Sequence, residues 1–213
     1  MKTDELITLL ANGGAAAEDD AVARRYAMAL GWGAFGAMLL MALLFGVRAD
    51  IAAAARLPMF WVKLAVPAII AIASVYAACR LSRPGGRLHR EPWFMAVPVV
   101  AVWLVAAYVL LAAPPADRMA LVMGSTWQYC LLAIPLLSLP ILLAVLWAMK
   151  GLAPTRLAIA GGIGGLLAGS IGGFVYALHC PEMDAPFLGV WYVAGMLIPA
   201  LVGMLAGPRL LRW

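Results

Sequence analysis

Charged residues are scarce in this chain of 213 residues. They make up 12% of it, while 66% of the residues are hydrophobic and the mean hydropathy is +0.99. Soluble domains are typically about 45–50% apolar and about 25% charged. A water-soluble globule of this size could not bury so much apolar surface, so the composition excludes that class and predicts an integral membrane protein. The net charge of +5 is therefore interpreted through its distribution over the loops, and not as a sign of nucleic-acid binding.

Motifs of several enzyme and transporter classes are missing as well. Gly-rich phosphate loops, Ser/His/Asp sets, the HExxH pattern and internal repeats are absent. No charged residue falls near the midplane of an apolar segment, where transport and proton relays usually need one. The Cys-x-x-Cys pair of quinone-linked disulfide enzymes is also lacking. We therefore do not expect an enzyme, and a small metal transporter or exporter, or a membrane thiol redox enzyme, are kept as alternative hypotheses.

Six apolar segments are long enough to cross a bilayer, which takes about 20 residues. They are 27–47, 58–79, 93–113, 130–149, 157–178 and 187–206. Lipid offers the backbone no hydrogen bonds, and barrel strands are shorter and alternate in polarity, so the segments are predicted to be helices. The predicted fold is all-α, a polytopic six-helix transmembrane bundle with short loops, flanked by segments 1–26 and 207–213. Lys63, near the start of the second span, is expected to snorkel to the interface.

The basic residues are distributed unevenly between the two sides of this bundle. Six spans place both termini on one side, and that side carries Lys2, Arg24, Arg25, Arg80, Arg83, Arg87, Arg90, Lys150, Arg156, Arg209 and Arg212. The other side carries only Arg48, Arg56, Lys63 and Arg118. Because loops rich in Lys and Arg stay in the cytoplasm, both termini are predicted to be cytoplasmic.

The fifth span carries a ladder of glycines. Gly161, Gly165, Gly169 and Gly173 recur at every fourth position. Such ladders let the backbones of membrane helices approach closely. The pattern predicts the central helix of a compact bundle, and a contact between two copies of the chain is the alternative.

Topology separates the three cysteines. Cys79 lies at the cytoplasmic end of the second span, where a lone thiol is most simply an apolar filler. Cys130 opens the fourth span and Cys180 closes the fifth, so both lie on the outer side. Three interpretations of this pair remain open: a static disulfide, a redox- or metal-responsive pair, or two unrelated buried thiols.

The stretch VYALHCPEMDAP surrounds Cys180 with further ligand types. His179 and Met183 are candidate metal ligands beside the two thiols, because thiolate, thioether and imidazole suit soft or borderline ions such as Cu, Zn or Cd. Alternatively, His179 bonds a loop carbonyl and Met183 is an ordinary apolar residue. Glu182 and Asp184 are interpreted as solvated charges of a turn. No obligatory cofactor is expected.

The N-terminal MKTDELITLLANGG predicts one short amphipathic helix. Thr3 and Asp4 are typical of a helix start, and Leu6, Ile7 and Leu10 form an apolar face. A helix of about two turns is marginal in water. It therefore needs a surface, which could be the membrane, the other cytoplasmic loops or a partner protein.

Several of these stretches together resemble NrsF-type proteins, which are bacterial inner-membrane anti-sigma factors. The resemblance is carried by MKTDELITLLA, STWQYC, the Gly-rich span ending in ALHCPE, and the final WYVAGMLIPALVGMLAGPRLLRW, and it covers essentially the whole chain. It implies an inner-membrane protein that holds an extracytoplasmic-function sigma factor on the cytoplasmic face. It further implies release of that factor when heavy metal or oxidant acts on two periplasmic cysteines, here Cys130 and Cys180.

The resemblance also implies where the sigma factor binds. The segment from Lys2 to Ala11 would form part of the binding surface. Arg83 and Arg87 in the basic second loop would complement an acidic partner surface. The expected partners are thus a sigma factor and membrane lipid, with no direct contact to nucleic acid and with a homodimer left open.

Overall fold

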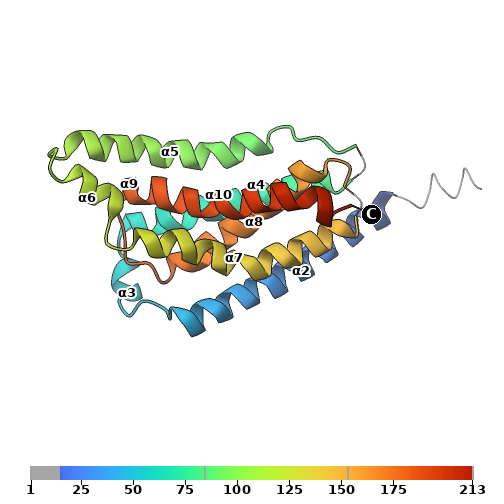
Figure 1. The fold of residues 1–213 in the computed structure, drawn as a ribbon, viewed down its shortest axis with the longest axis horizontal. Helices are drawn as coiled ribbons and strands as arrows, with labels where there is room; N and C mark the ends of the chain where they lie inside the picture. The colour runs from blue at the N-terminus through green and yellow to red at the C-terminus, as the bar shows by residue number, and fades with distance from the viewer. Residues whose placement is uncertain (1–14, 84, 153, 213) are drawn as a thin grey trace, which may run out of the picture.

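The computed structural model of the chain describes residues 15–83, 85–152 and 154–212, and these form helices joined by short loops (Figure 1). The helices are α2 (Ala15–Leu44), α3 (Ile51–Ala54), α4 (Pro58–Leu81), α5 (Glu91–Ala112), α6 (Arg118–Met123), α7 (Trp127–Lys150), α8 (Leu157–Ala177), α9 (Ala185–Phe187) and α10 (Val193–Leu210), with a π-helical turn at Leu188–Tyr192 leading into α10. Six helical stretches in the described residues are long and apolar enough to cross a membrane. The predicted all-α bundle of six spans is confirmed.

The first span ends earlier than its apolar run suggests. The run continues to residue 47, but α2 stops at Leu44 because Gly46 adopts a left-handed conformation with φ of 72°. The Gly46 N–H donates to the Met41 carbonyl at 2.8 Å, which closes the last turn of the helix. Glycine is the residue that takes this conformation without steric cost, so it sets the end of the helix.

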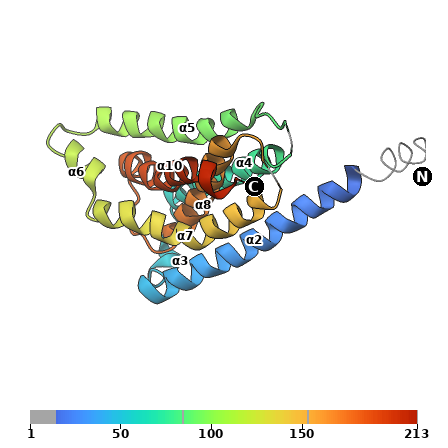
Figure 2. The same cartoon turned by 45° about the vertical axis from the view of Figure 1, so that its right-hand side comes forward.

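Helix α8 lies at the centre of the bundle, as its glycine content predicted. It packs against α10, α7, α4 and α2, and it is the most deeply buried of the six spans. Helix α5 lies on the outside and packs mainly on α4 and α9. Figures 1 and 2 show α5 and α2 on opposite sides of the bundle, with α7, α8 and α10 between them.

The glycine ladder of α8 is used within one molecule. A methyl group on Gly161 would overlap the carbonyl oxygen of Gly203 in α10, and one on Gly165 would overlap that of Pro199. A methyl group on Gly169 would overlap the Met196 carbonyl oxygen in the same way. The face that could have paired two copies of the chain is therefore occupied by α10, which approaches to backbone contact.

The outer surface of the bundle is apolar. Trp32 in α2 and Leu111 in α5 are 75% and 78% exposed, and many other large apolar side chains lie on the same outer faces. A soluble monomer rarely shows contiguous apolar surface on this scale. An apolar surface of this kind is compatible with contact to lipid tails, which agrees with a membrane protein.

The chain alternates between two ends of the bundle (Figure 1). The cysteine end consists of the connections 45–57, 113–126 and 178–184. The basic end consists of the first turns of α2, the loop 82–90, the loop 151–156 and the end of α10. In Figure 2 the first turns of α2 project beyond the neighbouring helices at the basic end.

Candidate functional site

Two cysteines from different helices meet at the cysteine end. Cys130 lies in the first turn of α7, and Cys180 follows the end of α8. Their sulfurs are 3.8 Å apart, both residues are fully buried, and both are free thiols. The sequence placed them on the same side of the membrane, and the structure brings their side chains into contact.

Local backbone structure holds each thiol in place. The N–H groups of His179 and Cys180 both donate to the Tyr176 carbonyl at 3.0 Å, so the chain makes a last tight turn after α8. Pro181 has no N–H and cannot continue the helix, so the chain leaves the bundle there. On the other side, the Cys130 N–H bonds to the Thr126 carbonyl at 3.0 Å within the first turn of α7.

Lys63 lies against this site, contrary to the prediction that it snorkels to the interface. It is 2% exposed, and its Nζ donates to the carbonyl oxygens of Cys180 and Glu182, both at 2.7 Å. The ammonium also lies 5.2 Å from the centroid of the Tyr192 ring. Such a buried cation requires partners, and here they are the backbone around Cys180.

The position of Lys63 on its helix explains the wrong prediction. Phe60, Lys63, Pro67 and Ile70 are all buried, and their spacing places them on the same face of α4. That face points into the bundle, so the side chain extends toward the cysteines. The helical spacing of Lys63 relative to the neighbouring apolar residues could have indicated its burial. Hydropathy alone does not contain this information.

Arg48 is a second cation beside the same carbonyl. Its Nη1 donates to the Cys180 oxygen at 3.3 Å, and its backbone N–H donates to the Leu178 oxygen at 3.2 Å. Two further bonds, of 2.7 and 2.6 Å, join the guanidinium to the Asp50 carboxylate. Hydrogen bonds from Arg48 lower the pKa of Asp50, and those to Asp50 raise the pKa of Arg48. The connection 45–50 is thereby attached to the Cys180 turn.

This environment favours the thiolate form of Cys180. The hydrogen bond from the Cys130 thiol lowers the pKa of Cys180, and the positive charge of Lys63 lowers it further against the effect of burial. A thiolate is the reactive and metal-binding form of cysteine. Lys63 and the Cys130 thiol thus both favour deprotonation of Cys180.

Glu182 is not the solvated turn charge that the sequence suggested. Its Oε1 accepts hydrogen bonds from the Ser125 N–H at 2.8 Å, the Ser125 hydroxyl at 2.5 Å and the Thr126 hydroxyl at 3.3 Å. Burial raises the pKa of Glu182, but the bonds from Ser125 and Thr126 outweigh it, so the pKa is lowered overall. The carboxylate thus ties the Cys180 loop to the start of α7. Asp184 differs, because burial and the charge of Glu182 raise its pKa.

The other two predicted metal ligands have separate surroundings. The Nδ1 atom of His179 lies 2.9 Å from the Gly46 carbonyl oxygen, and its ring packs on Phe45 and Tyr176. This is the alternative that the sequence offered for His179. Met183 is half-buried. The described residues contain no group of three or more His, Cys, Asp or Glu side chains that could hold a metal ion. A ligand role for His179 or Met183 stays a prediction.

Two residues of the predicted partner surface lie at the basic end. Arg83 and Arg87 are exposed on the loop 82–90. Thr3, Asp4, Leu6, Ile7 and Leu10 lie outside the described residues. The structure thus places part of the expected surface at the opposite end of the bundle from the thiols.

Contacts at the basic end connect α2 to its neighbours. The Arg25 guanidinium lies 4.5 Å from the centroid of the Trp147 ring, and its Nη2 donates to the Trp147 carbonyl at 3.3 Å. The Tyr26 and Ser82 hydroxyls share a buried hydrogen bond of 2.8 Å. Helix α2 is therefore attached both to α7 and to the start of the basic loop. No pattern in the sequence predicted these pairs.

The amino-acid sequence is similar over its length to those of one protein family. The family model described as "Negative regulator of sigma F" matches residues 10–213. A protein of Azospira oryzae named "Probable anti-sigma-F factor NrsF" is 51% identical over 213 residues, covering all of both chains. The "Anti-sigma-F factor NrsF" of Caulobacter vibrioides is 39% identical over 215 residues, again with both chains fully covered. Among solved structures none matches the chain.

Proposed function

The chain belongs to the NrsF family of negative regulators of sigma F, and from that membership we propose that it is an anti-sigma factor of the bacterial inner membrane. It holds an extracytoplasmic-function sigma factor on the cytoplasmic face through residues near its N-terminus and through the basic end. It releases that factor when an oxidant or a heavy-metal ion acts on Cys130 and Cys180 in the periplasm. The observation that supports the trigger is the 3.8 Å contact between the two sulfurs.

Two thiol reactions are open to this pair. A two-electron oxidant such as a peroxide would take one electron from each sulfur, so that both S–H bonds break, one S–S bond forms and two protons leave. A soft divalent cation would instead displace both protons and bind the two thiolates. The Cys180 thiolate starts either reaction, because Lys63 and Cys130 favour its deprotonated form.

A route from the thiols to the basic end runs through α7 and α2. Cys130 begins α7, and α7 carries Trp147 near its other end. Helix α2 packs along α7 at two small positions, because a Cβ on Gly33 would lie 2.8 Å from the Ile141 Cα and one on Gly36 would lie 3.1 Å from Pro140 Cβ. Close backbone packing transmits shifts as rigid-body movements.

Arg25 completes this route. Its contacts with Trp147 connect the end of α7 to the part of α2 that follows the N-terminal segment. A displacement of Cys130 that shifts α7 would thus reach the sigma-binding residues without unfolding any helix. The exposed Arg83 and Arg87 add charge complementarity to an acidic sigma-factor surface.

Membranes of unstressed cells that express the full chain provide the test. The protein is purified with a C-terminal tag, and co-purifying proteins are identified by mass spectrometry. A sigma factor is expected, and deletion of residues 1–14 is expected to remove it. Recovery of no sigma factor in unstressed cells would contradict the anti-sigma function.

The trigger is tested separately. The double variant C130S/C180S should retain the sigma factor after peroxide or Cd²⁺ treatment, whereas the wild type releases it. Cys79→Ser is the matched control and should respond as the wild type does, because Cys79 lies in the half of α4 nearest the basic end. Normal release from the double variant would exclude the thiols while leaving the anti-sigma function intact.

A further inference from the structure

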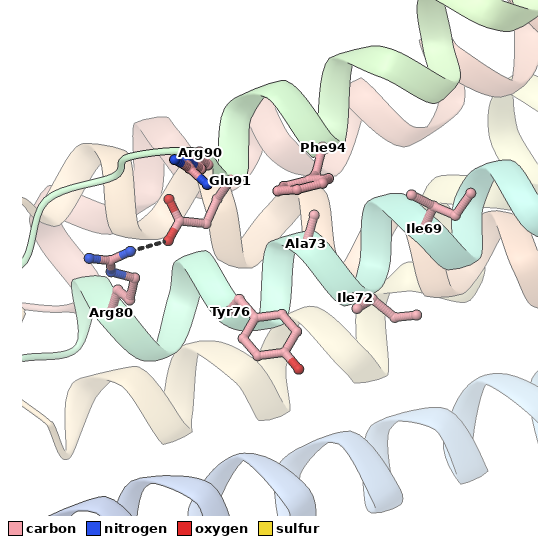
Figure 3. A pocket seen from close by; sticks show the side chains of 8 residues that line it. All are labelled: Ile69, Ile72, Ala73, Tyr76, Arg80, Arg90, Glu91 and Phe94. Atoms are coloured by element: carbon pink, nitrogen blue, oxygen red, sulfur yellow. Dashed lines mark hydrogen bonds and ion pairs between the residues drawn. The ribbon is translucent and has the colours of Figure 1, made fainter.

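A groove opens between α4 and α5 at the basic end, far from the thiol pair. Its volume is about 450 Å³, and Figure 3 shows the side chains that line it. The part away from the basic end is apolar and is lined by Ile69, Ile72 and Phe94. The charged side chains lie at one end only, so the groove is itself amphipathic.

Three charged residues form this polar end (Figure 3). Arg80 Nη1 lies 2.7 Å from Glu91 Oε1, and the other oxygen of Glu91 accepts the His89 N–H at 2.7 Å. The Glu91 charge is therefore matched by Arg80. Arg90 is exposed, and its side chain makes no hydrogen bond or ion pair with the described residues. One positive charge at the mouth is left for a ligand.

The length of the groove fits one leaflet of a bilayer. Ile69 and Arg80 are separated along α4 by a helical rise of about 16 Å, taking about 1.5 Å per residue. Half of a hydrocarbon core of about 30 Å is about 15 Å. If Arg80 and Arg90 lie at the depth of the lipid headgroups, Ile69 therefore lies close to the bilayer midplane.

We propose that this groove binds one anionic diacyl phospholipid from the leaflet that faces the basic end. Its phosphate lies against the guanidinium group of Arg90, which donates charge-assisted hydrogen bonds to the phosphate oxygens, while Arg80 stays paired with Glu91. An acyl chain lies along the apolar part against Ile72 and Phe94. A zwitterionic lipid is disfavoured, because its own cation would add to the positive charge of the loop 82–90.

The position of the groove gives this lipid a structural role. Helix α5 is the least buried of the six spans and depends on α4 for much of its packing. A lipid seated between α4 and α5 fills the space directly beside the loop 82–90, which joins the two helices. It would therefore hold in place the loop that carries Arg83 and Arg87.

Native mass spectrometry of the full chain in a mild detergent tests the assignment. Phosphatidylglycerol and phosphatidylcholine with the same acyl chains are added in equal amounts, and the lipid-bound fractions are compared. Phosphatidylglycerol should be retained at least about fivefold more strongly. Arg90→Gln should abolish this preference, whereas Arg24→Gln, which removes an exposed charge at the same end but outside the groove, should preserve it.

A second variant tests the acyl-chain half of the groove. Ile72→Trp places a bulky indole ring at an exposed position on the groove wall, where it would occupy the space of an acyl chain. It should therefore reduce phosphatidylglycerol binding without unfolding α4. Equal retention of the two lipids by the wild type would overturn the proposal, as would equal losses in R90Q and R24Q. Soluble glycerol phosphate is tested in the same way. If it is retained as strongly as phosphatidylglycerol, the occupant is not a lipid and the proposal is overturned.

Discussion

Replacing Lys63 with methionine tests the electrostatic basis of the thiol site. The substitution keeps a long side chain but removes the ammonium that donates to the carbonyls of Cys180 and Glu182. The loss of charge-assisted hydrogen bonds, about 1.5–3 kcal/mol each, is opposed by the loss of the cation's desolvation penalty of several kcal/mol. The free energy of unfolding should therefore change little. The reactivity of Cys180 should change much more.

The size of that change follows from Coulomb's law. If the Lys63 ammonium and the Cys180 thiolate are taken as unit charges about 6 Å apart, they attract by about 2.8 kcal/mol at an effective dielectric constant of about 20. An attraction of this size changes the thiolate population about a hundredfold at a pH below the pKa of the Cys180 thiol. Allowing for water that enters the altered site, we expect Lys63→Met to slow the reaction of Cys180 at least about tenfold at pH values below the wild-type pKa of this thiol. The rate–pH profile should shift to higher pH.

The assay is alkylation of the detergent-solubilised full chain, followed at each cysteine by peptide mass spectrometry. Lys150→Met is the matched control, because Lys150 is an exposed cation at the opposite end of the bundle. Cys180 in the control should react at the wild-type rate. Unchanged reactivity of Cys180 in Lys63→Met, with the fold intact, would refute the electrostatic argument, and so would equal slowing in Lys150→Met.

Two further substitutions test the packing and the polar contacts of the bundle. Gly165→Ala should lower the thermal midpoint in detergent by an amount equivalent to about 1–3 kcal/mol, because the added methyl group overlaps the Pro199 backbone. Gly31→Ala, where the added methyl group meets open space, is the neutral control. Equal stability of the two variants would contradict the close packing of α8 on α10. Glu182→Gln should lower the midpoint near pH 7. The pKa of Glu182 is lowered in the folded state, so its contribution is fully present above the unfolded value of about 4.3 and is lost as the pH falls below it. The difference between wild type and Glu182→Gln should therefore disappear in acid, and a difference that persists there would show that the charge is not its cause.

Most of the fold could be predicted because membrane insertion imposes strong rules on sequence. Length and continuous hydrophobicity predicted six helices, and the glycine period of the fifth span predicted the central position of α8. The meeting of Cys130 with Cys180 was partly predictable, because an alternating topology puts both at the same end. Their distance was not, because it depends on how α7 and α8 cross.

The residues that sequence reasoning placed wrongly share one cause. Lys63 and Glu182 were judged from hydropathy and position along the chain, which treat a charge near a span end as exposed. In the structure each is held by specific partners, Lys63 by two loop carbonyls and Glu182 by Ser125 and Thr126. Those partners come from segments distant in sequence, so one-dimensional patterns could not identify them. A buried or hydrogen-bonded charge tells more about the structure of the site than the surrounding sequence motif does, because each such charge needs a compensating contact.

The geometry of the pair also bears on which signal can move the bundle. Two thiolates bound to one tetrahedral ion at about 2.3 Å are about 3.8 Å apart, which is close to the resting separation of 3.8 Å. A disulfide needs about 2.05 Å, so the sulfurs must approach by roughly 1.8 Å. A ligand shifts an equilibrium only as far as it prefers one state over the other. An ion of zinc-like size would thus bind the two sulfurs with little change in their separation. Oxidation must bring the two sulfurs closer together and so changes the resting arrangement more, and we expect it to be the stronger trigger for release.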